Sequence, residues 1–170
     1  MIVTRQARPG DWLDAGRVHV AGWRYTYGGV FDYDFLAGLT PEGMSGWRQV
    51  RYRNPRWDAG HLVVTIDGVV RGFCDVGSSR SGDRPDITGE LYAIYLNPAF
   101  IGRGLGQRLI AASRQRLRDL GHERAELWVL DSNARTRRFY ETDGWESDGG
   151  QKQEEFGGTT ITEVRYVRDL

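Results

Sequence analysis

Residues 97–110 read NPAFIGRGLGQRLI and place three glycines, Gly102, Gly104 and Gly106, within five positions. An apolar run ends just before this stretch, and apolar residues recur at helical spacing after it. The stretch is therefore expected to join a strand to a helix. Because the first N–H groups of a helix have no internal acceptor and glycine lets a ligand approach the main chain, this junction predicts a phosphate site. The alternative, that the glycines serve only a tight turn and close packing, is less favoured for three glycines at one junction.

The class of phosphate ligand is narrowed by the residues that follow the glycines. A Walker loop needs Gly-Lys followed by Ser or Thr, whereas this chain has Gly106, Gln107 and Arg108. In a dinucleotide fingerprint the third glycine would fall at Gln107, and the stretch lies in the middle of the chain instead of opening a βαβ unit. Nucleotide hydrolysis and nicotinamide binding are both disfavoured.

The chain on either side of the glycines has the strand and helix patterns of one mixed α/β domain, residues 1–170. Asp67-Gly68 predicts the turn of a hairpin over 60–77, and Gly121 predicts the end of a helix. Asp11 and Thr40 are the expected helix caps. Further strands are expected at 1–7, 87–98, 124–130 and 159–170, helices at 9–27, 33–39, 40–55, 104–120 and 132–144, and a polar loop at 78–86.

Composition excludes several functional classes. The 23 basic and 23 acidic residues balance, which disfavours binding to nucleic acid or to an anionic membrane. Cys74 is the only cysteine, so no intramolecular disulfide can form, and the first residues have the pattern of neither a signal peptide nor a membrane span. A cytoplasmic protein is expected. The three histidines and Cys74 are scattered, so no metal site is predicted.

Three segments in order resemble the GCN5-related N-acetyltransferases (GNAT family). The frame Ile101-Gly102-Arg103-Gly104-Leu105-Gly106 is similar to the family's pyrophosphate loop, with Ile101 in place of the usual Gln or Arg. Upstream, GELYAIYLNP (89–98) resembles the family's fourth strand. Downstream, NARTRRFYETDGW (133–145) resembles its Asn and Phe-Tyr-Glu segment, with Trp145 in place of the common Phe. The early VHVAGWRYTYGG (18–29) extends the resemblance over nearly the whole chain.

The resemblance implies a mostly antiparallel sheet of six or seven strands flanked by helices, and an acetyl-CoA site. The pyrophosphate would bind the main-chain N–H groups of the loop, and the pantetheine arm would lie like an extra strand along a bulged strand that is splayed from its neighbour. The residues implied for the cofactor are Ile94, Tyr95, Leu96, Gly102, Arg103, Gly104, Leu105, Gly106, Gln107, Asn133 and Tyr140.

The same resemblance, combined with the chemistry of amide formation, suggests the reacting groups. A free amine has a pKa of about 10, so a base must remove a proton near neutral pH. Glu90 is the candidate base and Asp131 a weaker one, while Tyr140 is the candidate acid for the departing thiolate. Trp23 and Tyr27 are acceptor-site candidates. For each of these side chains, including Asn133 as a helix N-cap, an ordinary structural role remains the alternative.

The expected function is transfer of an acetyl group to a small-molecule or peptide amine by direct attack in a ternary complex. No histidine is patterned to activate Cys74, so a covalent acyl-enzyme is disfavoured. The main alternative is a catalytically silent CoA-sensing or protein-interaction module, and a domain without ligand is a third reading. The resemblance also implies dimerisation. It leaves the amine acceptor open.

Overall fold

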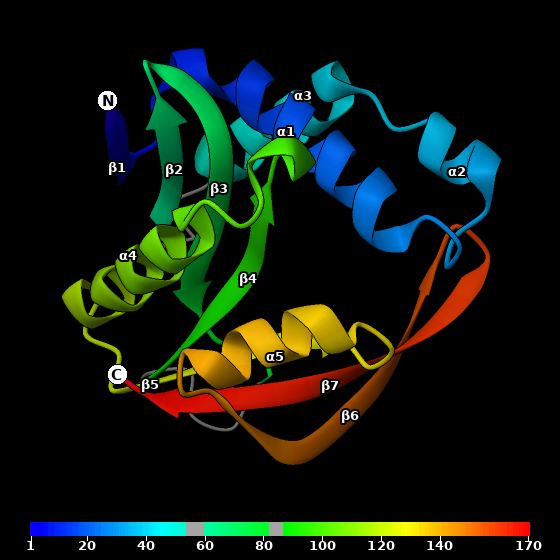
Figure 1. The fold of residues 1–170 in the computed structure, drawn as a ribbon. Coiled ribbons are helices and arrows are strands. Elements are labelled where there is room, and N and C mark those ends of the chain that lie inside the picture. The colour runs from blue at the N-terminus through cyan, green and yellow to red at the C-terminus, as the bar shows by residue number, and fades with distance from the viewer. Residues whose placement is uncertain (54–59, 82–86) are drawn as a thin grey trace.

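The structure of the protein is a computed structural model that describes residues 1–53, 60–81 and 87–170. Seven strands form one sheet in the order β1-β2-β3-β4-β5-β7-β6, and each recorded pairing is antiparallel except that of β4 with β5 (Figure 1). The expected mixed, mostly antiparallel sheet is confirmed. The strands are β1 Ile2–Gln6, β2 Gly60–Ile66, β3 Val69–Ser78, β4 Thr88–Leu96, β5 Arg124–Leu130, β6 Glu146–Phe156 and β7 Thr159–Asp169.

Helices cover the two faces of the sheet. On one face, α1 packs on β2 and β3 through a cluster that includes Trp12, Val18 and Phe73. On the other, α4 and α5 pack on β2 to β5 and on β7 through a larger cluster that includes Leu109 and Tyr140. The central strands are buried on both faces, which explains their nearly continuous apolar sequences. The helices are α1 Trp12–Tyr27, α2 Tyr33–Ala37, α3 Pro41–Arg53, α4 Leu105–Asp119 and α5 Ala134–Thr142, with short 3₁₀ turns at Pro9–Asp11 and Pro98–Phe100.

Most of the local predictions hold. Asp67 (φ 49°) and Gly68 (φ 83°) are both left-handed, as the tight hairpin turn between β2 and β3 requires. Thr40 accepts a hydrogen bond from the Gly43 N–H at 3.1 Å, as a cap should. Gly121, with φ 88°, follows α4 as expected. Residues 54–55 of the predicted third helix and 82–86 of the predicted polar loop lie outside the described residues.

Two expectations need correction. Asp11 stands at the N-cap of α1, but its carboxylate accepts hydrogen bonds from the Arg8 N–H (2.7 Å) and from the Arg5 guanidinium (2.6 Å), so it does not cap α1. The segment Glu146–Phe156, for which no element was predicted, is the eleven-residue strand β6. It is a largely exposed edge strand, so it lacks the apolar alternation that identifies half-buried strands.

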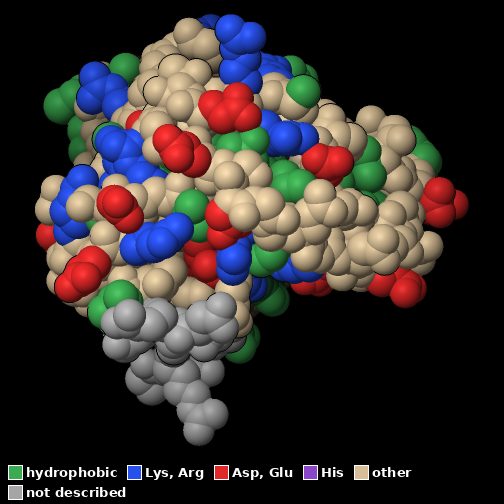
Figure 2. Space-filling view, turned by 90° about the horizontal axis from the view of Figure 1, so that it is seen from below, with side chains coloured by type: hydrophobic (Ala, Val, Ile, Leu, Met, Phe, Trp, Pro, Cys, Tyr) green, Lys and Arg blue, Asp and Glu red, His purple; other side chains and the backbone are tan. Residues whose placement is uncertain are grey.

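No helix in the three described ranges is long and apolar enough to cross a membrane. Viewed from below, acidic and basic side chains are interspersed over the visible face, without a large area of one sign (Figure 2). This agrees with the balance of 23 basic and 23 acidic residues in the sequence.

A charged cluster is buried between α1, α3 and the sheet. Arg48 of α3 donates to both carboxylate oxygens of Asp75 on β3, at 3.0 and 2.8 Å, and the His61 ring lies 2.9 Å from the same carboxylate. Burial opposes ionisation of Asp75, but the Arg48 charge and the hydrogen bond with His61 outweigh it and hold the pKa of that carboxyl below its ordinary value. Arg48 and Asp75 are 1% and 2% exposed, so neither charge has water as a substitute partner.

Replacing Arg48 with Gln is expected to lower the free energy of unfolding by about 3–5 kcal/mol, because the buried Asp75 carboxylate loses its guanidinium partner and keeps only the hydrogen bond with His61. The exposed Arg53 at the end of the same helix is the matched control, and Arg53→Gln should change stability by less than about 0.5 kcal/mol. Urea unfolding at pH 7 measures both values. Equal losses in the two variants would contradict this account.

The lowered pKa of Asp75 also predicts how stability depends on pH. Since the folded-state pKa lies below the unfolded one, the ion pair contributes fully above the ordinary Asp pKa of about 4 and is lost as the pH falls below it. Unfolding measured from pH 6 to pH 3 should show a smaller acid-induced loss in Arg48→Gln than in the wild type.

Candidate functional site

The glycine-rich stretch forms a loop that ends at the N-terminus of α4. Asn97 stops β4 and caps the following 3₁₀ turn by accepting from the Ala99 N–H at 3.1 Å. Gly102 (φ 82°) and Gly104 (φ 76°) are left-handed, and a Cβ at either position would meet no atom within 4 Å. The glycines are therefore required by backbone conformation, and the space around them is open. The first N–H groups of α4, from Leu105 to Gln107, point toward that space without an acceptor inside the helix.

The side chains of this loop have structural roles. A Cβ at Gly106 would lie 3.2 Å from the Phe139 ring, so this glycine allows α5 to pack closely against α4. Leu105 is completely buried in the core. The Arg103 guanidinium lies over the Phe100 ring, 5.0 Å from its centroid. Gly106 thus has a packing role and also lines the cleft described below, whereas Leu105 can offer a ligand only its main chain.

Strand β4 has an irregularity next to this loop. Val76 and Asp75 of β3 pair with Leu91 and Ala93, so Tyr92 is an extra residue in β4, a β-bulge. The parallel pairing of β4 with β5 ends at Leu91 and Leu127. Beyond that point the two strands diverge, as the family resemblance implied.

The bulge changes the direction of the main-chain groups of β4. The Asn97 N–H, directly after β4, donates to Arg71 of β3 at 2.8 Å. Because peptide groups alternate along a strand, the N–H and C=O groups of Leu96 and Ile94 then point away from β3, into the space between β4 and β5. A ligand with amide groups can therefore extend the sheet at this edge.

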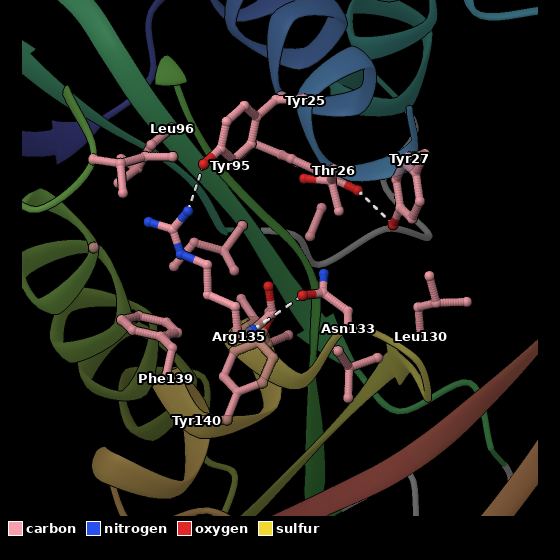
Figure 3. Close-up of a pocket in the computed structure, with 18 of the residues that line it drawn as sticks. Tyr25, Thr26, Tyr27, Tyr95, Leu96, Leu130, Asn133, Arg135, Phe139 and Tyr140 are labelled. Atoms are coloured by element: carbon pink, nitrogen blue, oxygen red, sulfur yellow. Dashed lines mark hydrogen bonds between the residues drawn. The ribbon is translucent and has the colours of Figure 1, made fainter. Parts of the chain in front are cut away.

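A cleft of about 630 Å³ occupies the space between the diverging strands. It is bounded by the end of α1, the glycine loop, the N-terminus of α5 and the halves of β4 and β5 that no longer pair with each other (Figure 3). It thus brings together most of the residues implied for the cofactor. Those that line it are Ile94, Tyr95, Leu96, Gly102, Gly104, Gly106, Gln107, Asn133 and Tyr140, together with Tyr27, whereas Arg103 and Leu105 do not.

Asn133 and Arg135 stand at the start of α5. The Asn133 side chain accepts from the Thr136 N–H at 3.1 Å, which confirms its capping role, while the residue also lines the cleft. Arg135 donates to the Tyr25 hydroxyl at 2.6 Å and so connects α5 to α1 (Figure 3). Sequence reasoning did not connect Tyr25 with Arg135, because no local pattern relates residues 110 positions apart.

Tyr140 extends from α5 into the floor of the cleft and is only 6% exposed. Burial raises the pKa of its phenol, and the neighbouring Tyr27 adds to the shift. The Tyr27 and Tyr95 hydroxyls lie 3.2 Å apart. The cleft therefore contains neutral phenols, which are hydrogen-bond donors at neutral pH.

A second cleft, of about 470 Å³, adjoins the first. Tyr27, Trp128 and Glu163 line both clefts, as does the bulged segment of β4. The predicted residues Glu90 and Trp23 line this second cleft only. Its walls come from α1, α3 and strands β3 to β7, and their side chains are mostly aromatic or charged.

Glu90 is held by a partner that the sequence did not indicate. Its carboxylate accepts from the Arg80 N–H at 2.9 Å and forms an ion pair with the Arg80 guanidinium at 2.5 Å. Glu90 itself is 1% exposed, whereas the Arg80 side chain is about half exposed. Asp131, the weaker candidate base, instead forms an ion pair with Arg137 and lines neither cleft.

The described residues form neither a metal-binding cluster nor a reactive thiol. Within the three described ranges, no group of three or more His, Cys, Asp or Glu side chains is arranged to hold a metal ion. Cys74 is fully buried, its Sγ lies 3.7 Å from the Leu109 carbonyl oxygen, and burial raises the pKa of its thiol. A thiol in this state is a poor nucleophile.

The proteins that this chain resembles are consistent with the geometry of the site. The sequence matches the Acetyltransferase (GNAT) family over residues 32–145. It is 32% identical over 136 residues to the uncharacterized N-acetyltransferase YuaI of Bacillus subtilis, covering 78% of this chain and 74% of YuaI. It is 30% identical over 138 residues to an uncharacterized N-acetyltransferase of Archaeoglobus fulgidus, covering 80% and 87% of the two chains.

Among solved structures, the fold is similar to that of yncA from Salmonella typhimurium, determined with its cofactor acetyl-CoA. The TM-score is 0.75 at 21% identity, with 99% of this chain and 94% of yncA covered. The fold, the diverging strands and the sequence matches agree, and the chain belongs to the GNAT family of acetyltransferases and is an acyltransferase.

Proposed function

We propose that this protein transfers an acetyl group from acetyl-CoA to a primary amine by direct attack in a ternary complex. The observation that carries the proposal is that two clefts meet at the bulged segment of β4. One cleft offers main-chain groups and a helix N-terminus, and the other offers aromatic and charged side chains. A donor and an acceptor can thus approach the same point from different sides.

The first cleft fits acetyl-CoA. The open space at Gly102 and Gly104 and the N–H groups at the start of α4 suit a pyrophosphate, and Gln107 lines the same region. The main-chain groups of Ile94 and Leu96 suit the amides of the pantetheine arm, which would extend the sheet. The similar fold of yncA, solved with acetyl-CoA, supports this assignment.

In the proposed reaction the amine nitrogen attacks the thioester carbon, a C–N bond forms and the C–S bond breaks. The amine proton passes to Glu90, directly or through a water molecule, and the hydrogen bonds from Arg80 orient that carboxylate. The departing thiolate takes a proton from Tyr140, whose raised pKa keeps it protonated at neutral pH. Main-chain N–H groups of the diverging strand stabilise the oxyanion. The buried Cys74 takes no part.

The donor site is tested by calorimetry with acetyl-CoA. The wild type should bind with micromolar affinity, about −8 kcal/mol. Gly104→Glu should abolish binding, because it places a side chain and a negative charge in the loop. Gly121→Glu is the matched control: it is also a left-handed glycine with open space around it, but it lies at the other end of α4. Loss of binding in both variants, or in neither, would contradict the assignment.

The base is tested with Glu90→Gln, which should lower kcat by about 100-fold or more while acetyl-CoA affinity is retained. The deficit should shrink as the pH rises toward the pKa of the amine, because less proton removal is then needed. Glu126→Gln is the control, since Glu126 pairs with Glu90 across β4 and β5 and is also buried but lines neither cleft.

Equal losses in the two glutamate variants, with no change with pH, would mean that Glu90 is structural. A wild type that binds acetyl-CoA but acetylates no amine would support the silent module instead.

A further inference from the structure

The wall of the second cleft that is built by β5, β6 and β7 already binds an ammonium group. Lys152, the only lysine of the chain, places its Nζ 2.8 Å from Glu154 Oε1 and 3.2 Å from Glu163 Oε2. The same Nζ lies 4.8 Å from the centroid of the Trp128 ring. Two carboxylates and an aromatic face are the groups that recognise an alkylammonium ion. This wall therefore has the chemistry of an ammonium site.

The charges at this wall are not balanced. Among the described residues that line the cleft, Glu154 and Glu163 share the single ammonium of Lys152, so these three side chains together carry one net negative charge. The other carboxylates that line the cleft, Asp75 and Glu90, each have an arginine of their own. Lys152 contacts one oxygen of each of its two carboxylates, so the second oxygens can accept from another cation.

On the opposite wall of the cleft, the carboxylates of Asp75 and Glu90 are paired with arginines, and the guanidinium of Arg51 also lies there. Arg51 of α3 places its guanidinium 5.0 Å from the Trp47 ring centroid and 4.7 Å from that of Tyr92. The negative charge of the cleft is thus concentrated on the side of β6 and β7. A cationic ligand will orient its charged end toward Glu154 and Glu163.

Glu163 and Trp128 also connect this wall to the proposed reaction point, because both residues line the two clefts. The aromatic rings of Trp23 and Phe156 lie in the same cleft, 6.1 Å apart, and offer an apolar surface for a hydrocarbon chain. An acceptor can therefore place one nitrogen at the bulge of β4 and a second charge at the carboxylates.

We propose that the acceptor is a diamine: one amino group is acetylated at the β4 bulge while the second, as an ammonium ion, is bound by Glu154 and Glu163. This inference rests on the proposed function. The inference adds to that function the recognition of the second ammonium group. A monoamine of the same length is therefore a poorer acceptor.

The test is acetylation of 1,5-diaminopentane, n-pentylamine and 5-aminopentanoate by the purified protein, with KM and kcat measured separately. The diamine should have the lowest KM. Glu163→Gln should raise the KM for the diamine roughly fivefold to tenfold and leave that for pentylamine unchanged. Lys152→Gln should do the opposite and lower the KM for the diamine, because both carboxylates are then available. Glu155→Gln, on the same strand but exposed, is the control and should change neither KM.

The KM for the diamine should rise in one variant and fall in the other, and this difference distinguishes recognition of the second ammonium group from a structural role of these residues. If Glu163→Gln and Lys152→Gln lower turnover of all three amines alike, or if pentylamine is as good an acceptor as the diamine, the inference is overturned and the proposed function stands. If acetyl-CoA binds but none of a broad set of amines is acetylated, the proposed function itself fails and takes the inference with it.

Discussion

The site depends on where the pairing of two parallel strands stops. Strands β4 and β5 pair only as far as Leu91 and Leu127, and the extra residue Tyr92 turns the next peptide groups of β4 outward. Unpaired main-chain groups away from water are costly, so a sheet opened in this way needs a partner. The glycine loop and the start of α4 lie at the same opening, and together they define a site made mostly of backbone.

A site made of backbone and a site made of side chains meet in this molecule, and they place different constraints on the sequence. The first cleft requires glycines at two left-handed positions and a regular helix start, which few sequences provide. The second requires only that aromatic and charged side chains lie on facing elements, and many combinations satisfy this. A donor shared by a whole family and an acceptor particular to one protein are a natural result of this division.

The sequence predicted the features that have local signals. The glycine loop, the Asp67-Gly68 turn and the caps at Thr40 and Asn133 depend on neighbouring residues, and all are found in the structure. Strand β6 was missed because its polar sequence reflects an exposed edge.

The side-chain partners in the second cleft could not be predicted for a different reason. Arg80 and Glu90 are 10 positions apart, and Lys152 meets Glu163 only when β6 pairs with β7. The two clefts share only part of their walls. Because the glycine loop and α5 line only the first cleft, and α3 and β6 line only the second, the proposed function implies separate exits for CoA and for the acetylated product.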